Sequence, residues 1–273
     1  MGTHPFDLLM ELEPRDIRLD CAALHLARDA YPGLNVDRYL KQLDLLADAV
    51  AALRPGLAAN LRYKALHQVL VTERGLTGNR RSYYDPRNCY LNRVLDTNRG
   101  IPITLSTVWI EVARRLKWPV AGVALPGHFI VRIDDPERYI LVDPFNDGQT
   151  LTIADCRQLV RLRFGDELAF RRSYLKPIDS RGILARLLRN LRNVYLANND
   201  LPRAANILRR MAAIEPTNGR HLQDLAAICC RQGDVRNACA HLQLYLHRLP
   251  NGRDSDHVRD NLKLLRAALV ALN

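Results

Sequence analysis

The chain has 273 residues, of which 48% are hydrophobic and 25% charged, a composition typical of a soluble globular protein with one large or two modest domains. Forty Lys and Arg residues against 29 Asp and Glu give a formal net charge of +11, which would suit a nucleic-acid partner if the charge were clustered. Only five of the basic residues are Lys, and the arginines are spread among acidic residues, so we expect no nucleic-acid groove.

The ends of the chain and its cysteines bear on location and metal content. The N-terminal segment has no basic stretch followed by an apolar run, and no part of the chain approaches the roughly 18 apolar residues of a membrane span. We therefore expect a cytoplasmic protein that does not enter a membrane. The cysteines form no CxxC pair and no spacing suited to zinc, which predicts reduced thiols, no metal site and no cofactor. They are Cys21, Cys89, Cys156, Cys229, Cys230 and Cys239.

Helices are predicted for the front of the chain, from Ile17 to Glu73. Apolar residues recur there at helical spacing, and two Pro-Gly pairs interrupt the pattern, so we expect three helices. The third covers residues 57–71. The segment 83–92, rich in aromatic residues and asparagine, then predicts a structured loop that enters a helix.

A buried helix followed by three strands is predicted for the middle of the chain. The helix begins near Pro102, a residue favoured in the first turn, and continues as an apolar stripe. Strands are expected at three segments rich in β-branched and apolar residues, namely 120–125, 128–133 and 139–143. A hairpin centred on Asp135-Pro136 would place His128 opposite Asp143, with Cβ atoms about 5 Å apart. We therefore predict a hydrogen bond between these two side chains.

A repeat with a period of 34 residues occupies the end of the chain. Tyr195, Asp200, Ala204, Leu208 and Pro216 are followed, 34 residues later, by Cys229, Asp234, Ala238, Leu242 and Pro250. This period resembles that of the tetratricopeptide repeat, which forms one pair of packed helices per unit. We expect two units from Arg181 to Pro250 and a capping helix from Asp254 to Leu272. The predicted fold class is α+β for residues 1–176 and all-α repeats for residues 181–273.

The motifs of the middle segment resemble those of the transglutaminase-like superfamily. Gly127-His128-Phe129 and Val142-Asp143-Pro144-Phe145 match its His and Asp motifs. Together with the repeats, five short motifs are similar to the bacterial SirB family of transglutaminase-like/TPR proteins: Gly78-Asn79, Tyr84-Asp85-Pro86, Asn88 to Asn92, Gly100 to Ser106 and Pro126 to Phe129. The resemblance implies a papain-like core of a helix and an antiparallel sheet, in which the helix carries a nucleophilic Cys and two strands carry the His and the Asp.

The expected nucleophile is missing from this pattern. Counting back from residues 117–119, which end the nucleophile helix, places the Cys position near Pro102 or Ile103, and neither side chain can attack a carbonyl. His128 and Asp143 would then be a residual catalytic pair, or alternatively a hydrogen bond that only locks the sheet.

Other nucleophiles stay open at this point. Thr104 and Ser106 lie near the helix start, but a hydroxyl there points to another side of the helix and would need strong activation. Cys89 is the thiol of the motif-rich segment, and a loop between it and the helix could fold it toward His128. A cysteine-type hydrolase or amide transferase that uses Cys89 or a hydroxyl is the alternative to a non-catalytic protein.

We expect a non-catalytic protein that acts in protein–protein interaction, and the SirB resemblance implies a regulatory role. A protein or peptide partner would bind in the repeat groove or in a pocket around His128, although the repeats could instead pack on the front domain. The candidate binding residues are Asn88, Asn92, Tyr195 and Asn199. A nucleic-acid-binding regulator is a further alternative.

Overall fold

The fold was obtained as a computed structural model, which describes residues 4–271. The chain divides into two compact units between Leu187 and Leu188, inside the helix α8 (Ser180–Ala197). Within the described part of the chain, no helix is long and apolar enough to cross a membrane. The predicted limits at residues 176 and 181 stay a prediction.

Helices form the front of the first unit. The three that the apolar spacing predicts are α2 (Leu19–Ala27), α3 (Val36–Ala52) and α4 (Ala59–His67), and a further helix that was not predicted, α1 (Pro5–Glu11), precedes them. Asn35 caps α3, because its side-chain oxygen accepts a hydrogen bond from the backbone N–H of Arg38 at 3.1 Å. The third predicted helix is found as α4 followed directly by a π-helical segment, Gln68–Glu73.

The next segment leads to the central helix of this unit. Two short parallel strands, β1 (Thr77–Gly78) and β2 (Arg99–Gly100), bracket the 3₁₀ helix η2 (Pro86–Cys89) and the helix α5 (Leu91–Thr97). The central helix α6 (Pro102–Arg115) has every residue from Pro102 to Ala113 buried, and it packs against α2, α3 and α5. The buried residues of α6 include polar side chains besides the apolar stripe, among them Thr104, Ser106 and Glu111.

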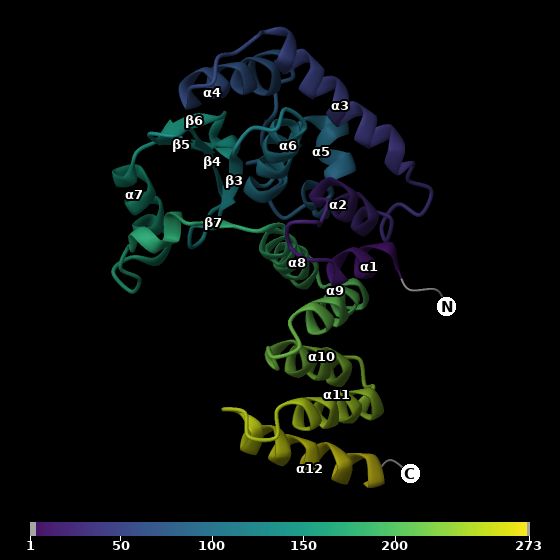
Figure 1. The fold of residues 1–273 in the computed structure, drawn as a ribbon. Helices are drawn as coiled ribbons and strands as arrows, with labels where there is room; N and C mark the ends of the chain where they lie inside the picture. Colours follow the sequence, from purple (N-terminus) through teal and green to yellow (C-terminus); the bar gives the residue numbers. More distant parts are fainter. Residues whose placement is uncertain (1–3, 272–273) are drawn as a thin grey trace. The chain divides into compact units, whose positions relative to one another are not determined.

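A five-stranded antiparallel sheet lies between α6 and α7 (Ile153–Phe164) (Figure 1). The strands, in their order across the sheet, are β6 (Gln149–Leu151), β5 (Tyr139–Asp143), β4 (Ile130–Asp134), β3 (Val120–Val123) and β7 (Pro177–Ile178). Side chains alternate between the two faces, so Ile130 and Leu141 pack with Cys156 of α7 while α6 covers the opposite face. The α+β class predicted for this part is confirmed.

The hairpin between β4 and β5 differs from its predicted register. Ile133 pairs with Ile140, two residues further along than predicted, and His128 precedes β4 instead of lying in it. Asp135 widens the turn: its N–H donates to the carbonyl of Arg138, and its carboxylate accepts from the N–H of Arg138, both at 2.9 Å. A shift of two residues leaves each side chain on its original face, so the expected neighbours of His128 are preserved.

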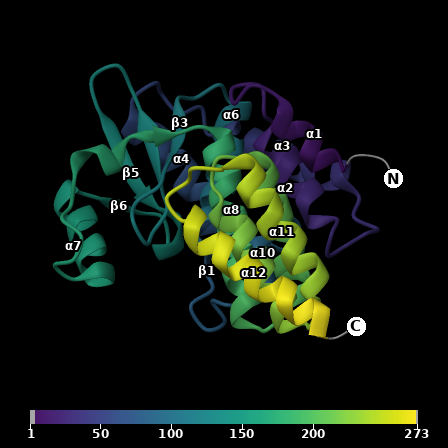
Figure 2. The ribbon, with the colours of Figure 1, turned by 90° about the horizontal axis from the view of Figure 1, so that it is seen from below.

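The second unit is a stack of helices in sequence order (Figures 1 and 2). After the end of α8 come α9 (Leu201–Ile214), α10 (Arg220–Arg231), α11 (Val235–Arg248) and α12 (Ser255–Ala271). Asp200 and Asp234, one period apart, each cap the second helix of a repeat. Ala204 and Ala238 are fully buried, so the paired helices approach closely. The predicted last residue of the capping helix, Leu272, lies outside the described residues.

Candidate functional site

His128 lies in the turn between β3 and β4, and the turn is held from two sides. Arg186 donates from Nη2 to the carbonyls of Leu125 and His128, at 3.2 and 3.3 Å. Gly127 has a φ of +75°, and a Cβ at this position would lie 2.6 Å from Cγ of Arg163 on α7. Only glycine meets both conditions without strain, which gives the Gly-His-Phe motif a physical reason.

The predicted hydrogen bond between His128 and Asp143 is present. Nε2 of His128 lies 2.7 Å from Oδ2 of Asp143, whose side chain is fully buried at the end of β5. Asp143 also accepts from the side-chain amide of Asn146 at 2.7 Å and from the N–H of Phe145 at 3.0 Å. Since an ionised carboxylate only accepts, Nε2 carries the proton and Nδ1 is the ring nitrogen left for other contacts.

These bonds decide the ionisation of Asp143. Burial alone would raise the pKa of its carboxyl, but the hydrogen bonds from His128 and Asn146 outweigh burial and hold the pKa below its ordinary value. Asp143 is therefore ionised at neutral pH, and it fixes both the imidazole orientation and the 3₁₀ helix η3 (Pro144–Asn146).

Two aromatic rings and the guanidinium of Arg80 lie around the His128 side chain. The ring of Phe145 stands edge-on to the imidazole, with centroids 6.3 Å apart, and the ring of Tyr83 lies 5.9 Å from Phe145. Arg80 places its guanidinium 5.6 Å from the Phe145 ring centre and donates to the Asn146 side chain at 2.8 Å. This setting holds the imidazole in one orientation.

The side chains at the start of α6 are buried or already hydrogen-bonded. Pro102 is its first residue, and Ile101 and Ile103 beside it are buried. The hydroxyl of Thr104 accepts from the N–H of Ile101 at 3.2 Å and donates to the carbonyl of Asn88 at 2.7 Å. The hydroxyl of Ser106 is fully buried. Both hydroxyls are therefore shielded from a substrate in this structure.

Cys89 lies at the end of η2 and is only 1% exposed. Burial is the main cause that raises the pKa of its thiol far above the ordinary value, with a smaller contribution from the charge of Asp85. The thiolate is the reactive form, so this environment favours an unreactive, neutral thiol.

The structure places the four predicted binding residues as follows. Asn88 is buried and ties its loop together, accepting from Asn79 at 2.9 Å and donating to the Ser82 carbonyl at 2.6 Å. Asn92 is buried in the first turn of α5. Tyr195 is buried under the guanidinium of Arg203, at 5.9 Å, and Asn199 forms the left-handed turn after α8. Their role in binding stays a prediction.

A groove of about 450 Å³ in the second unit was missed by the sequence reasoning. Residues of α10, α11 and α12 line it: Gln223, Asp224, Ala226, Ala227, Cys230, Leu242, Val258, Asn261, Leu264 and Leu265. Leu264 is 70% exposed, although Leu262 two residues before it is buried. The adjacent Leu264 and Leu265 were the available signal. Neighbouring positions on a helix point in different directions, so both cannot face the interior of the stack.

Comparisons with known proteins cover both units. Residues 37–189 match the transglutaminase-like superfamily, and residues 191–263 match the tetratricopeptide repeat. A UPF0162 protein of Xylella fastidiosa is 36% identical over 262 residues, which are 93% of this chain and 92% of that protein. A UPF0162 protein of Pseudomonas aeruginosa is 32% identical, over 75% of this chain and 78% of the relative.

The likeness extends to a mammalian protein over a shorter segment. F-box only protein 21 of Mus musculus is 36% identical over 104 residues, which are 35% of this chain and 17% of that protein. The transglutaminase-like and tetratricopeptide parts of the predicted resemblance are confirmed by these matches. The narrower likeness to SirB stays a prediction.

Proposed function

This chain belongs to the UPF0162 family and to the transglutaminase-like superfamily, and we propose that it is a non-catalytic protein that binds a partner protein through its tetratricopeptide unit. Repeats of this kind generally present a surface to a peptide or helix. The partner segment we propose is an amphipathic helix or strand whose apolar side chains enter the groove of α10–α12.

The observation that carries this proposal is the exposed apolar lining of the groove. Leu264 leaves 70% of its surface in water, and the small side chains of Ala227 and Cys230, one helical turn apart, leave room beside it. Gln223 and Asn261 add polar groups to the lining. Apolar surface with a few polar groups is the usual composition of a peptide-binding groove.

The absence of catalysis rests on the first unit. His128 and Asp143 keep the geometry of a base and its orienting carboxylate, but the start of α6 has Pro102 and Ile103 near the position where the resemblance expects a thiol. An oriented imidazole without a nucleophile in reach does not perform acyl transfer. We propose that the pair serves to brace the turn before β4 against η3.

Selection of displayed peptides on the full-length protein tests the groove. We expect enriched peptides to share apolar residues at helical or alternating spacing. Leu264→Asp should weaken their binding by about tenfold or more, because a charge would enter the apolar contact. Val270→Asp is the matched control, since Val270 is 78% exposed on the same helix and does not line the groove.

Two results would contradict the proposal. One is a failure to enrich any peptide on the folded protein, and the other is equal binding to wild type and Leu264→Asp. Circular dichroism melts of both variants show whether the stack remains folded, which separates lost binding from lost structure.

A further inference from the structure

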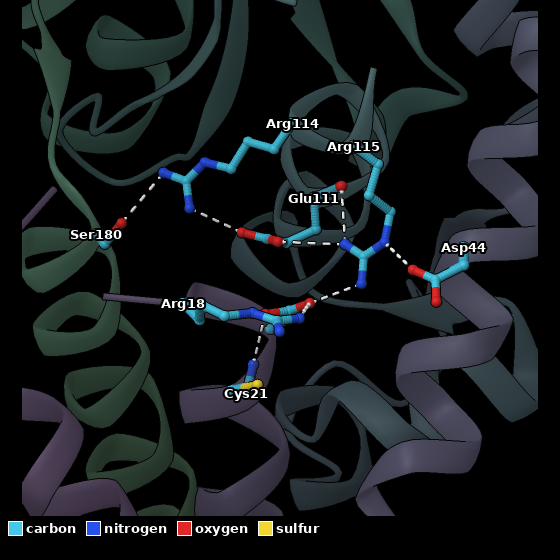
Figure 3. Close-up of polar contacts among 8 residues, drawn as sticks. Arg18, Cys21, Asp44, Glu111, Arg114, Arg115 and Ser180 are labelled. Carbon is cyan, nitrogen blue, oxygen red and sulfur yellow. Dashed lines mark hydrogen bonds and ion pairs between the residues drawn. The ribbon is translucent and has the colours of Figure 1, made fainter. Parts of the chain in front are cut away.

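A cleft of about 940 Å³ opens in the first unit, away from the residues of the His128 site. It is lined by the end of α6, the start of α2 and of α8, one residue of α3, and the loop 13–17. Two of its carboxyl groups are almost fully buried, since Asp20 is 0% and Glu111 4% exposed. Figure 3 shows Glu111 between Arg114 and Arg115, with Arg18 beneath them.

The two buried carboxylates share one largely shielded cation, Arg115. The Arg115 side chain is 16% exposed, and its guanidinium contacts Asp20 at 2.7 Å, Asp44 at 2.6 Å and Glu111 at 3.4 Å. Arg18 and Arg114 are more exposed, at 60% and 37%, so water screens their charges. The two buried carboxylates, Asp20 and Glu111, are therefore balanced by a single weakly screened cation, Arg115, which leaves an excess of negative charge inside the cleft.

Hydrogen-bond donors are divided unequally between the two carboxylates. Asp20 accepts from the N–H of Cys21 at 2.7 Å, from Arg18 at 3.0 Å and from Arg115 at 2.7 Å. Glu111 has one short bond, from Arg114 at 2.8 Å, besides the long contact with Arg115. Asp20 is the better stabilised anion, so Glu111 is the group on which a proton would be held.

The pKa values follow the same division. Burial raises the pKa of Glu111 to about 7, with a further rise from the charge of Asp20 and an opposing effect of the two neighbouring arginines. For Asp20, burial also acts upward, but the hydrogen bonds from Arg18 and Arg115 hold its pKa below the ordinary value.

The other charged groups of the cleft do not remove this excess. The remaining charged residues of the lining are Glu13, Arg15 and Asp16 in the loop, Asp44 of α3, and Asp179 before α8. Across the whole lining, six acidic residues face four arginines. The thiol of Cys21 on α2 is the further titratable group near Glu111, and burial raises its pKa, so it adds no charge at neutral pH.

We propose that Glu111 takes up a proton from the cleft at near-neutral pH, and that this releases a latch between the end of α6 and the start of α8. The latch is Arg114, which donates to Glu111 at 2.8 Å and to the hydroxyl of Ser180 at 3.1 Å (Figure 3). Proton uptake converts the carboxylate to a neutral carboxylic acid, so the bond from Arg114 loses its ionic part. The first turn of α8 is then held less firmly.

Carbon-13 labelling of glutamate side chains in the full-length protein tests the titration. The Glu111 carboxyl, assigned from its loss in Glu111→Gln, should titrate with a midpoint near pH 7. Asp44→Asn is the control, because Asp44 binds the same arginine but is 59% exposed, and it should leave a near-neutral transition in place. A midpoint below about pH 5, near the value of an ordinary glutamate, overturns the proposal.

Hydrogen exchange tests the latch separately. After correction for intrinsic rates, amides of residues 183–187 should exchange several-fold faster at about pH 6 than at about pH 8, and Glu111→Gln should remove this difference. Ser180→Ala removes the acceptor of Arg114, so it should speed exchange at both pH values without moving the Glu111 midpoint. If Glu111→Gln does not fold, hydrogen exchange of the wild type and of Ser180→Ala at both pH values still tests the latch. Equal exchange of the wild type at both pH values overturns the latch.

Discussion

Asp143 and Glu111 are both buried carboxyl groups of the first unit, and their pKa values move in opposite directions. Asp143 accepts hydrogen bonds from His128, Asn146 and the N–H of Phe145, whereas Glu111 has a single short bond and another carboxylate nearby. Burial is the largest single influence on each group and acts upward on both. The number of donors around the carboxylate therefore decides whether a buried carboxyl is an anchor or a proton acceptor.

The largest effect is expected from removing the anchor. Asp143→Ala would leave the partly buried donors of His128, Asn146 and Phe145 without their buried acceptor, so it should lower the free energy of unfolding by about 3 kcal/mol. Urea denaturation measures this. Asp166→Ala is the control, because its carboxylate is 95% exposed, and it should change stability by less than about 0.5 kcal/mol. Equal effects of the two substitutions would contradict the anchoring role.

A smaller effect, dependent on pH, is expected from Glu111→Gln. A carboxyl whose pKa is raised by folding contributes stability that is fully present below its unfolded pKa and is lost as pH rises through its folded pKa. The wild type should lose this contribution between about pH 5 and about pH 8. The variant has no titrating carboxyl at this position, so this contribution is absent from its stability at every pH. The stability of the variant relative to wild type should therefore rise by on the order of 2 kcal/mol across that window.

Urea denaturation of both proteins at several pH values measures this difference. Asp143 titrates outside the window, because its depressed pKa makes its contribution present above the ordinary aspartate pKa and lost only as pH falls below it. A constant difference between wild type and Glu111→Gln from about pH 5 to about pH 8 would show that Glu111 is not the proton acceptor.

The repeat unit and the His128–Asp143 contact could both be predicted from the sequence, because both depend on local periodicity. The shared spacing of Asp200 and Asp234 marks two helix caps, and the two-residue period of a strand survived an error in the hairpin register. The Glu111 cluster could not be predicted, since Asp20 and Glu111 are brought together only by the packing of α2 on α6. Burial of this kind is a tertiary property with no signal at either residue.

Cys89 is a third buried titratable group, and both influences on its pKa act upward. We therefore expect its thiol to be unreactive. Burial and the charge of Asp85 both raise its thiol pKa, so neither a thiolate nor an activated nucleophile forms near neutral pH. Iodoacetamide should modify the exposed Cys230 of the native protein while Cys89 is protected, as peptide mass spectrometry can show.

Hydrolysis and amine incorporation on glutamine-containing peptides should be at background for wild type, Cys89→Ala and His128→Ala alike. Turnover by the wild type that either substitution abolishes would contradict the non-catalytic proposal. Loss of turnover in both variants would identify Cys89 as the nucleophile, and would mean that α6 and η2 rearrange to expose the thiol.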